Sequence, residues 1–308
     1  MHPPIRLAIL LYLLLGGLGA WAQSDAVKGV TSERHPLACL IVPSRDSTVA
    51  ELDTILMADP GCLAAYRLRA RAHARSLRYR QAVADYTAAI ARGATDRAVF
   101  RNRAVAWSRL REWPNAIDDY TRALEADPIY AGAYYGRGNI FRLMRDNFQA
   151  MRDFRMAVRY DPRMARAHNG IGNIHARWGQ YATAIEKYTQ AIRLNADVAI
   201  YHQNRGRTRY DSGDLEGAIG DLSQAIRLRP NYGKAYANRG RAKRKLGDID
   251  GALADFEKAV EIDGAPRIRL WQRGLIQKER YVGAVDGEMT PALREAIRLC
   301  TREPACWE

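Results

Sequence analysis

Histidine and carboxylate side chains are the first candidates for chemistry, and their spacing does not assemble a catalytic group. His168 and His175 lie seven residues apart, which places both on one face of a helix, as a shared metal ion would require. We interpret them, together with His202, as residues of a helical core. The sequence contains no Ser–His–Asp or Cys–His grouping, no phosphate-binding loop and no H-E-x-x-H motif. Glu186 and Asp221 fall on solvent-facing or paired helix positions and have no partner that would tune a pKa, so we predict no enzyme, no cofactor and no metal site.

The start of the chain has the order of a secretory signal peptide. Arg6 precedes an apolar stretch that extends from Leu7 to Ala20, and Ala20-Trp21-Ala22 forms a small-x-small cleavage site. The apolar stretch is short for a membrane span, and the sequence contains no other long apolar run. We therefore predict that residues 1–22 are removed. The mature protein is then periplasmic or secreted in a bacterial envelope, without a membrane span.

Four cysteines remain after the predicted cleavage, in two groups that lie far apart in the sequence. Because an exported protein meets an oxidising compartment, we predict the disulfides Cys39–Cys62 and Cys300–Cys306 at the two ends of the fold. A zinc site of four thiolates is the alternative. The absence of a C-x-x-C spacing disfavours it.

A pattern of small residues recurs every 34 residues through the middle of the chain. Ala82, Tyr86 and Ala89 open the series, and the first of these alanines recurs as Ala116, Ala150, Ala184, Ala218 and Ala252. A second helical stretch upstream of each carries its own small residue: Ala70, Ala104, Gly138, Gly172, Gly206 and Gly240. One helix pair cannot bury its apolar face alone, so stacked pairs must share a continuous core. The period predicts an all-α protein with six helix-turn-helix repeats over residues 63–266.

These copies resemble the tetratricopeptide repeat, a family with aromatic residues at positions 4 and 24 and small residues at 8, 20 and 27. Position 24 here is Tyr86, Tyr120, Phe154, Tyr188, Leu222 and Phe256. The family's proline at position 32 is present in three copies, as Pro128, Pro162 and Pro230. The resemblance covers about two-thirds of the chain and implies a right-handed α-solenoid with a concave groove. Residues 49–60 keep the same phase, so we interpret residues 23–62 as an N-terminal cap with a partial repeat.

Arginine at position 7 and aspartate at position 23 vary together between the copies. Five copies carry both residues, for example Arg69 with Asp85, whereas the fourth copy has Ile171 and Lys187 instead. We interpret this covariation as an ion pair between the two helices of a repeat.

Basic residues concentrate on the helix that would line the groove. Positions 1–19 of the six copies contain 25 basic and 7 acidic residues, whereas positions 20–34 contain 11 and 15. In the family the groove is lined by positions 2, 5, 9, 12 and 13. Here these positions contain one acid, Asp211, and the basic residues Arg67, Arg71, Arg75, Arg101, Arg109, Arg142, Arg166, Arg177, Arg207, Lys234, Arg241, Arg244 and Lys245. A solvated face without a partner is the alternative interpretation.

Asparagines at position 6 are further candidates for ligand contact. Asn102, Asn204 and Asn238 occupy this position, where asparagines of peptide-binding relatives hold a ligand's backbone. The resemblance does not imply a clamp for a chaperone's C-terminal carboxylate, because arginine and alanine replace most of its lysine and asparagine set.

Residues 267–308 resemble a different module, the peptidoglycan-binding-like domain. Trp271-Gln272-x-x-Leu275, Tyr281-Val282-Gly283, Asp286-Gly287 and Pro291 follow that family's spacing, although Thr290 and Leu293 depart from it. The resemblance implies a glycan contact through Tyr281 and Asp286. A helical cap on the last repeat is the structural alternative.

The formal net charge of +14 comes from 48 basic and 34 acidic residues, and it suggests an anionic partner. Export disfavours a nucleic acid. We therefore expect an exported, non-enzymatic scaffold or adaptor that binds an acidic protein or peptide in its groove. Peptidoglycan binding through residues 267–308 is the alternative function.

Overall fold

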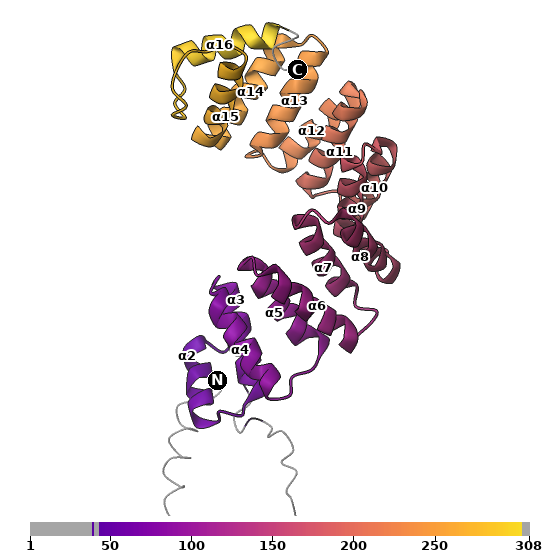
Figure 1. The fold of residues 1–308 in the computed structure, drawn as a ribbon, viewed down its shortest axis with the longest axis vertical. Helices are drawn as coiled ribbons and strands as arrows, with labels where there is room; N and C mark the ends of the chain where they lie inside the picture. Colours follow the sequence, from indigo (N-terminus) through magenta and orange to yellow (C-terminus); the bar gives the residue numbers. More distant parts are fainter. Residues whose placement is uncertain (1–38, 40–42, 304–308) are drawn as a thin grey trace, which may run out of the picture. The chain divides into compact units, whose positions relative to one another are not determined.

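The structure is a computed structural model that describes Cys39 and residues 43–303, and all of its regular structure there is helical (Figure 1). The fifteen helices of these residues are α2 Val49–Ala58, α3 Leu63–Arg75, α4 Tyr79–Ala91, α5 Arg97–Arg109, α6 Trp113–Ala126, α7 Ala131–Leu143, α8 Asn147–Tyr160, α9 Ala165–Arg177, α10 Tyr181–Leu194, α11 Ala199–Ser212, α12 Leu215–Leu228, α13 Gly233–Lys245, α14 Ile249–Asp263, α15 Ala265–Gln277 and α16 Pro291–Arg302. None of them is both long and apolar enough to span a membrane. The predicted signal peptide, residues 1–22, lies outside the described residues.

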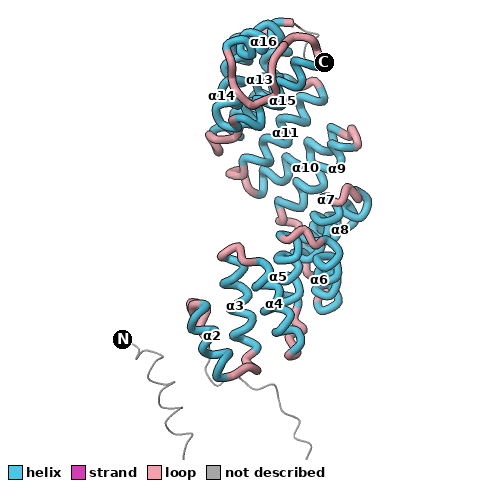
Figure 2. Tube along the Cα trace, turned by 60° about the vertical axis from the view of Figure 1, so that its left-hand side comes forward, coloured by secondary structure: helices cyan, strands magenta, loops and turns pink. Residues whose placement is uncertain are grey.

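Helices α3 to α14 form six antiparallel pairs, and each pair packs on the next (Figure 2). Each pair with its turns spans one 34-residue copy, so we number the repeats 1 to 6 from residue 63, with repeat 3 at residues 131–164. The predicted α-solenoid of six helix-turn-helix repeats is confirmed.

Small residues bring the helices of each pair close together. Ala70 of α3 and Ala82 and Ala89 of α4 are fully buried. In repeat 3 the small residue of the first helix is Gly138, where a Cβ atom would lie 3.0 Å from Cβ of Asp153 and 3.1 Å from the Phe154 ring. Any larger side chain would therefore push the two helices apart.

The five predicted arginine–aspartate pairs are present, and each arginine also reaches the preceding repeat. In repeat 2, Nε and Nη2 of Arg103 each donate a hydrogen bond of 2.7 Å to the Asp119 carboxylate. The third nitrogen, Nη1, donates to the Thr87 hydroxyl of repeat 1 at 3.0 Å. The other pairs are Arg69–Asp85, Arg137–Asp153, Arg205–Asp221 and Arg239–Asp255. One arginine thus joins three helices.

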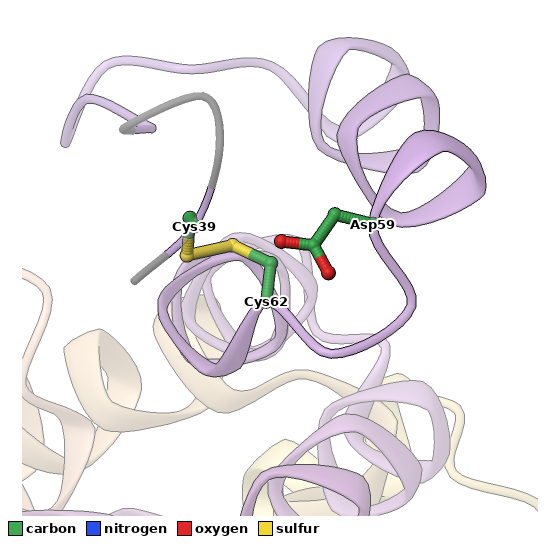
Figure 3. A group of neighbouring side chains, drawn as sticks. All are labelled: Cys39, Asp59 and Cys62. Atoms are coloured by element: carbon green, nitrogen blue, oxygen red, sulfur yellow. A yellow bond between two sulfur atoms is a disulfide. The ribbon is translucent and has the colours of Figure 1, made fainter. Parts of the chain in front are cut away.

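The N-terminal cap is fixed by a capping box and a disulfide. Thr48 accepts a hydrogen bond from the Glu51 amide and donates its own amide to the Glu51 carboxylate, which starts α2. The predicted Cys39–Cys62 disulfide is confirmed, and Figure 3 shows the Asp59 carboxylate beside it. Cys62 also caps α3, because its Sγ accepts a hydrogen bond from the Ala65 amide at 3.4 Å.

Two helices continue the stack beyond repeat 6. Helices α15 and α16 both pack on α14, and Trp271, Leu293 and Ile297 share one buried cluster with Phe256 of repeat 6. Cys300 is buried in the same cluster, but Cys306, its predicted disulfide partner, lies outside the described residues.

Candidate functional site

The first helices of repeats 2 to 5 line two adjoining pockets. The pocket-lining side chains come chiefly from positions 2, 5, 9, 12 and 13, which are the positions that the family resemblance implied. We call them the charged compartment, about 540 Å³ between α7, α9 and α11, and the apolar compartment, about 330 Å³ along α5 and α7. The sequence predicted a basic groove, but it did not predict this division.

Arginine dominates the charged compartment. Arg142, Arg166, Arg177 and Arg207 line it, whereas Asp211 is its one acidic residue. Asp211 lies 3.7 Å from Nε of Arg207 and neutralises part of that charge. Burial, followed by the nearby charge of Arg177, lowers the pKa of Arg142. An anion placed between these two guanidinium groups would relieve their repulsion.

Asparagine amides complete the charged compartment, and existing hydrogen bonds orient them. The Asn139 Oδ1 atom accepts from Nε and Nη2 of Arg142 at 3.1 and 2.8 Å. The Tyr188 hydroxyl donates to Oδ1 of Asn173 at 2.8 Å, and Nδ2 of Asn204 donates to Oδ1 of Asn169 at 2.9 Å. Because these oxygens are already engaged, the Nδ2 groups of Asn139, Asn169 and Asn173 remain as donors for a ligand.

The sequence interpretation missed three of these four asparagines. It considered asparagine only at position 6, where Asn204 lies, and counted only charges at the groove positions. Asn139, Asn169 and Asn173 occupy groove positions 9, 5 and 9. A count of hydrogen-bonding amides at the same positions would have identified them.

Glycines in α7 allow aromatic rings to lie close to the helix backbone at the apolar compartment. Val105, Trp113 and Leu143 contribute to its walls, the Tyr120 ring packs against Gly136, and a Cβ atom at position 132 would lie 3.1 Å from the Tyr130 ring. A Cβ atom at position 136 would lie only 2.3 Å from Cζ of Tyr120. Arg101 and Arg109 stand at the same pocket.

Tyr135 and Arg166 separate the two compartments. Both residues line both pockets, and the guanidinium carbon of Arg166 lies 4.6 Å from the centre of the Tyr135 ring. This cation–π contact holds a charge and an aromatic face at the boundary. Asn139 is the third residue shared by both compartments.

The other predicted groove residues lie outside the charged compartment, and several have partners within the chain. Arg67 forms an ion pair with Asp96 at 2.9 Å, and Nη1 of Arg101 donates to Asn102 at 3.0 Å. In repeat 6, Arg244 donates to the carbonyl of Glu303, and Lys245 lies 5.6 Å from the Tyr210 ring. Four further cations, Arg71, Arg75, Lys234 and Arg241, are exposed, and Asn238 is half-buried. The predicted set therefore does not form one continuous site.

The two residues considered for glycan contact serve the C-terminal helices. Tyr281 is buried in the cluster formed with α14. The Asp286 carboxylate accepts from Nε2 of the fully buried Gln272 at 2.7 Å and from the Glu288 amide at 2.9 Å. The hydrogen bond from the Glu288 backbone amide, followed by the hydrogen bond from the Gln272 side chain, lowers the pKa of Asp286. This geometry is that of a structural turn.

Histidine and cysteine side chains serve as packing residues. His168 and His202 are buried, and their Nε2 atoms lie 3.0 and 2.9 Å from the backbone carbonyls of Pro162 and Ala196. Within the described part of the chain, the one cluster with metal-ligating potential is Cys39, Asp59 and Cys62. Its two sulfur atoms are bonded to each other, so they are not available as thiolate ligands.

The fold and the groove define an α-solenoid of helix hairpins, and the family comparisons identify its repeats. Tetratricopeptide repeat models match residues 67–130, 135–199 and 233–266, and a TPR repeat model matches residues 206–245. These segments make up more than half of the 308 residues and end at residue 266. The chain belongs to the tetratricopeptide repeat family.

Solved structures show the same architecture. A tetratricopeptide repeat protein from Parabacteroides merdae is 21% identical, with a TM-score of 0.57 over 70% of this chain and 85% of that one. The C-terminal part of a TPR repeat-containing protein from Cytophaga hutchinsonii is 20% identical, with a TM-score of 0.53 over 69% and 84%. The Cut9–Hcn1 assembly of the APC/C is 17% identical, with a TM-score of 0.58 over 84% and 50%. At these identities the likeness concerns the fold alone, and a search of curated proteins gave no sequence match.

Proposed function

We propose that this protein is a non-enzymatic scaffold or adaptor that binds an acidic protein or peptide in the groove of repeats 2 to 5. The observation that carries this proposal is the charged compartment, where four arginines face one aspartate. Amide donors beside the arginines suit the backbone carbonyls and carboxylates of an extended acidic segment. The described residues contain no arrangement of nucleophile, base and oxyanion donor that would suggest catalysis.

We further propose that the protein acts after export, in the periplasm or outside a bacterial cell. The signal-like sequence of residues 1–22 and the Cys39–Cys62 disulfide support this location, because structural disulfides are typical of oxidising compartments. Mass spectrometry of protein recovered from the periplasm tests it. We expect a mature chain that begins at Gln23, whereas retention of residue 1 in a cytoplasmic fraction would refute export.

Charge reversal in the charged compartment tests the binding proposal. Arg142→Glu with Arg177→Glu should abolish binding of a fluorescent peptide rich in aspartate and glutamate, since it replaces two attractive charges with two repulsive ones. Arg159→Glu with Arg193→Glu makes the same change of net charge at exposed positions of α8 and α10 and should preserve binding. The unchanged protein should also release the peptide as salt rises from 0.05 to about 0.5 M. Equal losses in both variants would mean that net charge, and not the groove, attracts the peptide.

Peptidoglycan binding by residues 267–308 has less support. Tyr281 is buried, and the exposed Asp286 carboxylate uses its Oδ1 atom to accept hydrogen bonds from Gln272 and the Glu288 amide within the turn.

A further inference from the structure

The groove of repeats 2 to 5 presents two unlike chemical environments side by side. The apolar compartment offers Val105, Trp113 and Leu143 together with the Tyr120 ring. The charged compartment offers guanidinium and amide groups. Arg101, Arg109 and Arg166 also line the apolar compartment, but a uniformly acidic ligand would leave Val105, Trp113 and Leu143 in contact with water.

The apolar compartment has the features of a site for one large apolar side chain. Leu143 is half-exposed and Trp113 is only partly buried, although both are strongly apolar, so a ligand could remove further apolar surface from water. Gly136 carries no side chain, so the Tyr120 ring lies against the α7 backbone and forms one wall of the compartment. Gly170 occupies the equivalent position in repeat 4, and Asn102, Asn204 and Asn238 occupy it in repeats 2, 5 and 6.

The boundary between the compartments sets the spacing of the two ligand groups. Arg166 lies over the Tyr135 ring, and Asn139 is held by Arg142 on the charged side. Neighbouring helices lie about 8–10 Å apart, and an extended peptide advances about 3.3 Å per residue. Two groups in adjoining compartments would therefore be about two to four residues apart in the ligand.

We propose that the groove recognises a two-part motif: a large apolar or aromatic side chain and, two to four residues away, a carboxylate. The apolar side chain enters beside Trp113 and Leu143, and the carboxylate lies between Arg142 and Arg177. An aspartate or glutamate side chain and a C-terminal carboxylate present the same chemistry to these arginines. This inference rests on the proposed function, and it adds the spacing and the apolar residue to it.

Labelled peptides of equal length and net charge test the motif by fluorescence anisotropy. The reference peptide is amidated and has tryptophan three residues before one glutamate in an otherwise Gly/Ser sequence. Replacing the tryptophan with serine, or moving the glutamate eight residues away, should weaken binding about tenfold or more. A fourth peptide replaces the glutamate with a free C-terminal carboxylate at the same spacing and distinguishes the two sources of the charge.

Two variants show which compartment binds each of the two ligand groups. Leu143→Gln should weaken binding of the tryptophan peptide but not of the serine peptide, whereas Arg177→Gln should weaken both. Leu246→Gln serves as the matched control, because Leu246 is similarly exposed after α13 and lines neither compartment. If the tryptophan and serine peptides bind equally and both are lost with Arg142→Glu and Arg177→Glu, the two-part motif is wrong and the acidic-peptide proposal stands. If no peptide binds, including the strongly acidic one, both proposals are refuted.

Discussion

Arg103 illustrates how one side chain stabilises this protein in two directions. Its guanidinium group holds Asp119 within repeat 2 and Thr87 in repeat 1, and Asp119 is only 1% exposed. A buried carboxylate that loses its partner retains the cost of its desolvation. We expect Asp119→Ala and Arg103→Ala each to lower the free energy of unfolding by about 3 kcal/mol, measured by urea denaturation.

The double variant should lower the free energy of unfolding by much less than the sum of the two single changes, because it removes the unpaired charge as well as the interaction. A coupling free energy of about 1–3 kcal/mol is expected from the cycle. Strict additivity would show that the two side chains do not stabilise each other.

The turn between the two helices of a repeat contains one residue with a left-handed backbone conformation. Leu77, Arg111 and Arg145 occupy position 15 of repeats 1 to 3 with positive φ angles of 60°, 64° and 66°, whereas repeats 4 to 6 have glycine there. A side chain in this region costs about 1 kcal/mol. Arg145→Gly should therefore raise the unfolding free energy by about 1 kcal/mol, and Gly179→Ala, where φ is 71°, should lower it by a similar amount.

Arg155→Gly is the control for this pair of changes, because Arg155 is an exposed residue in the interior of α8. Glycine should destabilise the protein there by about 1 kcal/mol. Stabilisation by Arg155→Gly, or none by Arg145→Gly in thermal unfolding, would contradict the conformational argument.

The sequence predicted the arginine–aspartate pairs but not the third partner of each arginine. The pairs were evident because both residues change together in the fourth copy. The partners Thr87, Thr121, Thr189 and Ser223, and Asp53 for the first copy, all lie at position 25 of the preceding repeat. These partners come together only when one repeat packs on the next. A comparison of the residues within each copy cannot reveal that packing.

At the scale of elements, the Cys39–Cys62 disulfide should stabilise the N-terminal cap. Helix α2 contributes Leu52, Ile55 and Leu56 to a small cluster around Cys62. The bond closes a loop with a sequence separation of 23 residues, and the chain-entropy model assigns such a loop about 3 kcal/mol. We expect Cys39→Ser to accelerate hydrogen–deuterium exchange in α2 and to leave α13 unchanged.

Cys39→Ser is preferred to a change at Cys62, because it keeps the sulfur that caps α3. Equal protection of α2 in the variant and the parent would mean that the apolar cluster alone holds the cap.

The C-terminal helices show why a motif did not determine function at this scale. Gln272, Asp286 and Gly287 match the spacing of a peptidoglycan-binding-like module, and in the structure they form one hydrogen-bonded turn. The Gly287 amide donates to Oε1 of Gln272 at 3.0 Å, and the φ angle of Gly287 is +86°. Residues with this spacing can form a structural turn or belong to a peptidoglycan-binding-like module. The spacing alone therefore could not distinguish the structural role from the binding role.

For the molecule as a whole, the 34-residue period predicted the architecture but not the shape of the groove. Small residues at three positions of each copy suffice to specify how the helices pair. The two compartments instead depend on side chains from several successive repeats, such as Trp113, Tyr135 and Arg166. Their juxtaposition exists only once the repeats are stacked.

Stacking also buries a series of tyrosines. As a result, the stability of the whole molecule depends on pH in the alkaline range. Burial raises the pKa of Tyr86 to about 12, and it also raises the pKa values of Tyr120 and Tyr188 at the same position of their repeats. The unfolded chain releases these protons near pH 10, but the folded chain retains them. The folded state therefore binds more protons above pH 10, and its stability must fall as the pH rises.

We expect the unfolding free energy to be unaffected by these tyrosines below about pH 9 and to decrease steeply between pH 10 and 12. Tyr86→Phe removes one titrating group, so it should reduce this slope by about 1.4 kcal/mol per pH unit. Phenylalanine is compatible with the position, because Phe154 and Phe256 occupy it in repeats 3 and 6 and are buried. Urea denaturation of both proteins at pH 8, 10, 11 and 12 measures the difference. Identical slopes would show that the Tyr86 hydroxyl is not protected by the fold, and that stacking of the repeats does not exclude water from this position.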